Sequence, residues 1–136
     1  MGKKSNAARI FTAFVGKFLL FHGVVTLIFR LCPPLDRAFP FLLAITQISA
    51  QHSLLHIATG LLAVAILRWG NARDCIFYAA LVGVAYAFLG AYCMATMHPT
   101  FFALQLFDHP FHMLIGLSGL ATAAQSALPQ VPSQAE

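Results

Sequence analysis

The segment SLLHIATGLLAVA (Ser53–Ala65) decides the fold, because it is apolar throughout and carries no charged residue. With its neighbours it forms a stretch from about residue 49 to residue 69, close to the roughly 20 residues with which a helix crosses a bilayer. Its titratable side chain is His56, which is followed by Gly60 four residues later. Residues at that spacing share one face of a helix.

The composition of the whole chain extends this prediction to the class of protein. Of 136 residues, 60% are hydrophobic and 9% are charged, whereas soluble domains contain about 25% charged residues. A soluble domain this short could not bury so much apolar surface. The net charge of +4 comes from scattered single residues, with Lys3-Lys4 as the longest basic run, which argues against a nucleic-acid partner. The three cysteines have no CxxC spacing, which argues against a disulfide framework.

Four apolar stretches are long enough to span a membrane. We therefore predict an all-α integral membrane protein, a four-transmembrane-helix bundle formed by one domain over residues 1–127. The predicted spans cover about residues 10–31, 49–69, 75–97 and 110–127. Residues 128–136 are polar and contain proline, and are predicted to form a disordered cytoplasmic tail. The connections 35–49 and 100–110 are apolar but too short to span, and are predicted to lie at the membrane interface.

The distribution of lysine and arginine predicts the orientation in the membrane. One side carries Lys3, Lys4, Arg9, Arg68 and Arg73, and the other carries Arg30 and Arg37. Because cytoplasmic loops are enriched in basic residues, both termini are predicted to be cytoplasmic, in a multi-pass protein of the plasma membrane. The lipid bilayer is therefore the first partner that the sequence predicts.

All six histidines lie in the half of the predicted helix bundle that is farther from the two termini. His52 and His56 share a helical face, as do His109 and His112, and His98 closes the third span as the last residue of the sequence CMATMH (93–98). Imidazole suits zinc, copper and iron, and thiolate or thioether favours Cu(I). The candidate metal ligands are His52, His56, His98, His109, His112, Cys93 and Met97. Each histidine alone is also explained by a hydrogen bond between helices.

A second copy of the His-Gly pattern lies 56 residues further along the chain, where His112 is followed by Gly116. This offset predicts two similar hairpins that bring His56 and His112 toward each other. A glycine one turn after each ring lets a neighbouring helix or a flat macrocycle approach closely. His56, His112, Gly60 and Gly116 are therefore the candidate cofactor-binding residues. His52 and His109 lie nearer the predicted interface, so we expect their substitution to matter less.

Asp108 is the acidic residue next to the histidines, and it has two interpretations. It can cap the fourth span, with Pro110 in the first helical turn. It can also orient His112 or His109, as a carboxylate behind a metal ligand does.

The two histidine segments, HSLLHIATGLLAVA (52–65) and FDHPFHMLIGLSGLATA (107–123), resemble the paired signatures of the DUF4383 family of small bacterial four-helix membrane proteins. That pattern has an Asn- or Asp-containing lead, then His, then Gly one turn later, in the second and fourth spans. Gln51-His52 departs from the Asn-type lead. The resemblance implies a four-helix fold in a bacterial inner membrane, and it implies no activity.

Three functions follow from these patterns. The first is a structural or accessory subunit that packs against other membrane proteins, in a larger complex or as a homo-oligomer. No nucleophile–base pair, phosphate loop or paired carboxylates occur, so we predict that the chain is not an enzyme. The second is binding of haem, a chlorophyll-type pigment, copper or zinc through His56 and His112. The third is a small transporter or proton relay, because ionisable residues inside a membrane are often functional.

Overall fold

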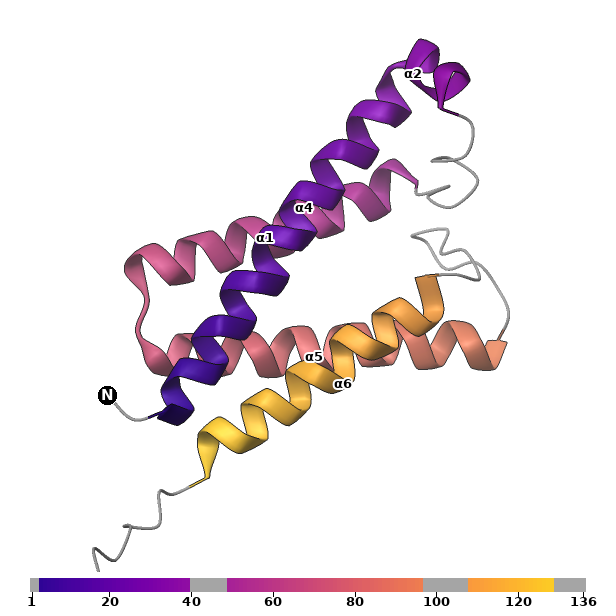
Figure 1. Cartoon of the computed structure of the whole chain (residues 1–136). Helices are drawn as coiled ribbons and strands as arrows, with labels where there is room; N and C mark the ends of the chain where they lie inside the picture. Colours follow the sequence, from indigo (N-terminus) through magenta and orange to yellow (C-terminus); the bar gives the residue numbers. More distant parts are fainter. Residues whose placement is uncertain (1–2, 40–48, 97–107, 129–136) are drawn as a thin grey trace, which may run out of the picture.

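The computed structural model describes residues 3–39, 49–96 and 108–128 of the chain. Every regular element within these ranges is a helix, which confirms the all-α class for this part of the chain (Figure 1). In chain order the helices are α1 (Lys3–Leu31), α2 (Pro33–Ala38), α4 (Ala50–Trp69), α5 (Ala72–Thr96) and α6 (Asp108–Ala127).

Three of these helices are long and apolar enough to cross a membrane, namely residues Ala7–Leu31 of α1 and the whole of α4 and α5. Their outward sides carry large apolar groups such as Phe14 and Trp69, which are 73% and 80% exposed. The chain is therefore a membrane protein. Helix α6 also has 20 residues, but polar side chains such as Asp108 and His112 lower its hydropathy, and it falls outside this set.

The helix ends follow from local sequence. Helix α1 ends at Leu31, and the two prolines that follow open α2, because proline fits the first turn of a helix. Helix α4 begins after Ser49, whose Oγ accepts a hydrogen bond from the backbone N–H of His52 over 3.1 Å. Between α4 and α5, Asn71 caps the new helix, and its Oδ1 accepts from the N–H of Arg73 over 2.8 Å. Helix α5, which contains the third predicted span, therefore starts at residue 72, earlier than the predicted residue 75.

The long helices pack as two pairs, α1 on α4 and α5 on α6, as the predicted hairpins require. Helix α1 crosses α4 and also contacts α5 and α6, so that it joins the two pairs (Figure 1). The buried core draws on all four helices and includes Phe11, Leu19, Ala63, Tyr78, Val82, Tyr86 and Ile115.

Glycines let the helices of each pair approach closely. A methyl group on Gly60 would lie 2.6 Å from the backbone nitrogen of Leu20 in α1. A methyl group on Gly116 would lie 2.6 Å from the Cα atom of Ala87 in α5. Both glycines are therefore covered by a neighbouring helix, which is one of the two uses that the sequence predicts for them.

Some predictions fall on other parts of the chain. The tail beyond Leu128 and most of the segments 35–49 and 100–110 lie outside the described residues. Of these segments, the structure describes residues 35–39, which include most of the short helix α2, the cap residue Ser49 and the first three residues of α6.

Candidate metal centre

The first turns of α4 place two histidines inside the protein. Because Ser49 fixes the start of α4, His52 falls in the first turn and His56 one turn later, on the same face. Their exposed fractions are 0% and 1%, and their ring centroids lie 4.4 Å apart. Although His52 was predicted to lie near the interface, its ring is buried and contacts the ring of His112 in α6.

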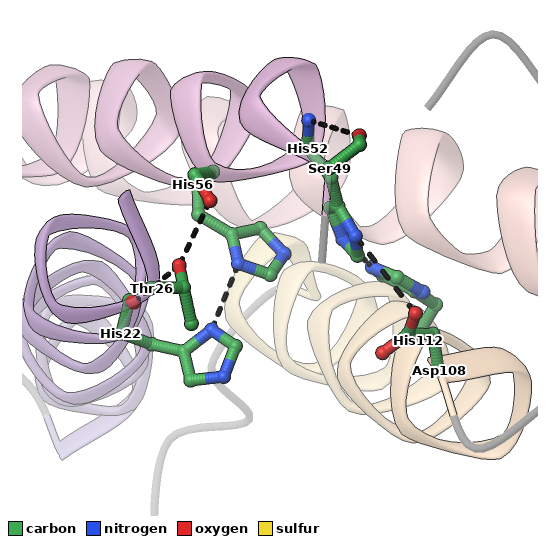
Figure 2. A network of polar contacts seen from close by, with 8 residues as sticks. His22, Thr26, Ser49, His52, His56, Asp108 and His112 are labelled. Carbon is green, nitrogen blue, oxygen red and sulfur yellow. Dashed lines mark hydrogen bonds and ion pairs between the residues drawn. The ribbon is translucent and has the colours of Figure 1, made fainter. Parts of the chain in front are cut away.

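Helix α6 adds a third ring to this pair. His112 is fully buried, and its Nε2 lies 3.1 Å from Nε2 of His52 (Figure 2). The ring centroids of His56 and His112 are 5.8 Å apart, which confirms the prediction that these two residues approach each other. The expectation that substitution of His52 matters less than that of His112 stays a prediction, and the structure shows that the two rings form one hydrogen-bonded pair.

The three rings together have the spacing of a metal site. His52, His56 and His112 each offer one ring nitrogen, and these nitrogens all lie within 4.8 Å of one another. Tetrahedral zinc with bonds of about 2.05 Å needs its ligand nitrogens about 3.3 Å apart. The required shift is within reach of small side-chain rotations. We call these three residues the histidine cluster, and it has the composition and geometry to bind a metal ion.

Two further residues contact the outer nitrogens of the cluster. Nδ1 of His22, in α1, lies 3.0 Å from Nδ1 of His56, and Oδ2 of Asp108, in α6, lies 3.8 Å from Nδ1 of His52 (Figure 2). In metal sites a histidine ligand is commonly held at its second nitrogen by such a partner, which fixes the tautomer and the ring orientation. Asp108 is the first residue of α6, and its carboxylate lies near His52, a neighbour that the sequence did not suggest. Its predicted role in orienting His112 or His109 stays a prediction.

The cluster also contains buried nitrogens that need a partner. Nδ1 of His52, Nε2 of His56 and Nδ1 of His112 have no hydrogen-bond partner among the described residues. A buried polar group in this state costs about 1–3 kcal/mol. Figure 2 shows the free nitrogen of His56 on the side of its ring that faces the His52–His112 pair. A cation between the three rings would satisfy this nitrogen.

One wall of the cluster is aromatic. The ring of Tyr86 stacks on His56 with centroids 6.0 Å apart and lies 5.2 Å from the ring of His112. Its hydroxyl donates to Oγ1 of Thr59 over 3.5 Å, so the polar end of Tyr86 points away from the cluster toward α4. This wall excludes water from one side of the site.

Two residues of this environment, His22 and Tyr86, were not among the site residues predicted from the sequence. The 56-residue offset aligned His22 with Tyr78 and so gave it no role. Tyr86 lies three residues after Gly83 and four before Gly90, on the face by which α5 contacts α6. That spacing is the signal that could have found it.

The remaining predicted ligands do not join the cluster among the described residues. His109 is 6% exposed, and neither of its ring nitrogens has a partner there, so it is buried but separate from the three rings. Cys93 is buried in α5, whereas the neighbouring Met94 is 45% exposed. Cys75 and Cys93 are both buried. Met97 and His98 lie outside the described residues.

Hydrogen bonds beside the cluster hold α1 against α4. Oγ of Ser53, in α4, lies 2.9 Å from Oγ1 of Thr26, in α1, and both side chains are buried. Thr26 also donates to the backbone carbonyl of His22 over 2.8 Å. A buried hydrogen bond between hydroxyls contributes about 1 kcal/mol, and this one fixes the turn of α1 that carries His22.

Fold and site together define an all-helical membrane protein with a buried three-histidine cluster that can bind a metal ion. Comparisons of the chain with protein family models, with curated proteins and with solved structures give no match. The resemblance to the DUF4383 family therefore stays a prediction, and the function is argued from the site alone.

Proposed function

We propose that this chain binds one transition-metal ion of the zinc or copper class through His52, His56 and His112. The observation that carries the proposal is the convergence of three buried ring nitrogens within 4.8 Å of one another. Imidazole is a good ligand for both metals. Three histidines leave a fourth coordination position open on zinc, for water or for a further ligand.

A single ion fits the cluster better than a macrocycle. A haem held between His56 and His112 needs an empty slot between the two rings. The ring of His52 lies 4.4 Å from that of His56 and 5.0 Å from that of His112, so it occupies this region. Gly60 and Gly116, which could have let a macrocycle approach the helices, are covered by Leu20 and Ala87. These contacts favour an ion over a haem or a chlorophyll-type pigment.

The proposal includes α6 as a fourth membrane span, which would complete a four-helix bundle. Its 20 residues give a length of about 30 Å, enough to cross the hydrocarbon core. Its first polar residues, Asp108, His109 and His112, are buried, whereas Leu114 and Leu117 are 69% and 55% exposed. Lipid would therefore meet the apolar side of α6.

The excess of basic residues at the end that carries Arg9, Arg68 and Arg73 supports an orientation with this end in the cytoplasm. In that orientation the histidine cluster faces the outer half of a bacterial inner membrane. The ion would then enter from outside, and an accessory role beside other membrane proteins is the natural use of a chain this small.

Titration of the purified protein with Co²⁺ tests the proposal directly. The chain is treated with a chelator in mild detergent, and Co²⁺ is added while the absorption of tetrahedral cobalt is recorded. We expect one ion per chain, displaced by Zn²⁺, because three imidazoles and one water suit both ions. A folded chain that takes up no Co²⁺, Zn²⁺ or Cu²⁺ would mean that the rings only join α1, α4 and α6 through hydrogen bonds.

Substitution of His22 tests whether the outer partner matters. In His22→Phe the ring of His56 loses its contact at Nδ1, and we expect the affinity for Co²⁺ to fall by about 10–100-fold, with one ion per chain retained. Thr12→Val is the matched control, because it also removes a hydrogen bond between α1 and a neighbouring helix but lies ten residues before His22, away from the cluster. Equal affinities in both variants would contradict the role of His22.

A further inference from the structure

A second polar region lies at the end of the protein away from the histidine cluster. There, α1 and α4 enclose a surface hollow of about 560 Å³ that is lined by Arg9, Lys17 and Arg68. The remaining wall is apolar and includes Ile10, Val64 and Leu67. Three basic side chains from two helices therefore line one hollow whose remaining wall is apolar.

The three positive charges are not neutralised by the part of the chain that the structure describes. No ion pair of Arg9, Lys17 or Arg68 occurs among the described residues. The acidic residue of α5 at this end, Asp74, accepts a hydrogen bond from the backbone of Asn71 over 2.7 Å, within the α4–α5 turn. The hollow thus presents an uncompensated charge that suits an anion.

The depths of the three residues match the boundary between headgroups and hydrocarbon. Lys17 follows Arg9 by eight residues, or about 12 Å along α1. Its neighbour Gly16 packs against Ala63, which precedes Arg68 by five residues, or about 7.5 Å along α4. Lys17 is therefore deeper than both arginines. A lysine at such depth extends its side chain back toward the headgroups, where it meets phosphate.

We propose that this hollow binds an anionic phospholipid, with the phosphate held by Lys17, Arg9 and Arg68. One acyl chain would lie along Ile10, Val64 and Leu67, because this wall offers apolar contact where a free anion would find none. Basic pockets between membrane helices bind anionic headgroups in this way. The proposal does not depend on metal binding, because it uses different residues at the opposite end of the helices.

Lipid selectivity in reconstituted vesicles tests the proposal. The protein is placed in phosphatidylcholine vesicles with a trace of spin-labelled phosphatidylglycerol or spin-labelled phosphatidylcholine, and the fraction of immobilised label is measured. We expect a clear preference for phosphatidylglycerol, lowered about fivefold in each of Arg9→Gln, Lys17→Gln and Arg68→Gln. Arg73→Gln is the matched control, because Arg73 is exposed at the same end but does not line the hollow.

Three results would overturn the proposal. The first is equal immobilisation of both lipids by the unsubstituted chain. The second is a loss in Arg73→Gln as large as in Lys17→Gln, which would indicate general surface charge. The third is full displacement of the labelled phosphatidylglycerol by inorganic phosphate, which would indicate a site for the free anion. Circular dichroism of each variant in detergent identifies any substitution that fails to fold, and Lys17→Arg, which keeps the charge, should retain the preference.

Discussion

Replacement of His112 by alanine is expected to lower the affinity for Co²⁺ or Zn²⁺ by at least about 100-fold. The substitution removes one of three ligand nitrogens and the 3.1 Å contact between His112 and His52. Loss of a residue behind a ligand already costs about 10–100-fold in other metal sites, so loss of a ligand should cost at least that much. Competition between Co²⁺ and a chelator of known affinity measures the change.

His109→Ala is the matched control for this prediction. His109 lies in the same turn of α6 and is buried to nearly the same degree, but it is not part of the histidine cluster. We expect its variant to bind Co²⁺ like the unsubstituted chain. Free imidazole added to His112→Ala should restore part of the binding, since a small ring can enter the space that the side chain leaves. A full affinity in His112→Ala would contradict the proposed site.

Gly116→Val is expected to destabilise the protein by about 3 kcal/mol or more. A Cβ atom at Gly116 would overlap the backbone nitrogen of Ala87 and lie 2.6 Å from its Cα atom. Backbone atoms inside a helix cannot rotate aside, so α5 and α6 would have to separate. Because His112 lies one turn before Gly116, the same movement would displace its ring. Unfolding in mixed micelles with increasing sodium dodecyl sulfate measures the free energy of unfolding.

The same side chain on the other side of α6 provides the control. Ala121 is exposed, and Ala121→Val adds apolar surface where lipid is expected. We expect a change of about 0.5 kcal/mol or less. If both valine variants unfolded alike, the close contact between α5 and α6 would not be a source of stability.

Much of the fold could be predicted from composition and from the lengths of apolar stretches. The helix ends at Leu31 and Trp69 were predicted within one residue, because prolines follow Leu31 and the polar turn Gly70-Asn71 follows Trp69. The pairing of α1 with α4 and of α5 with α6 was predicted from the 56-residue repeat of the His-Gly pattern, which implies two similar hairpins. The additional contacts of α1 with α5 and α6 could not be predicted, because they depend on side-chain packing along three helices at once.

The candidate site was predicted only in part, because the sequence pattern does not determine how the helices pack. The repeat of His and Gly correctly brought His56 and His112 together. It gave no information on the rotation of α4, which turns His52 inward beside His56, nor on the depth of His22 in α1. A spacing of four residues places two rings on one face, but the packing of the neighbouring helices decides whether that face is buried.

The division of the cluster between the two helix pairs has a consequence for biosynthesis. His52 and His56 are synthesised with the first pair of helices, whereas His112 follows with α6. Because chains fold from the N-terminus as they are made, the three nitrogens can meet only after α6 has docked. The proposed ion would therefore be acquired only after α6 has been synthesised, and it would stabilise only those chains in which α6 has docked correctly.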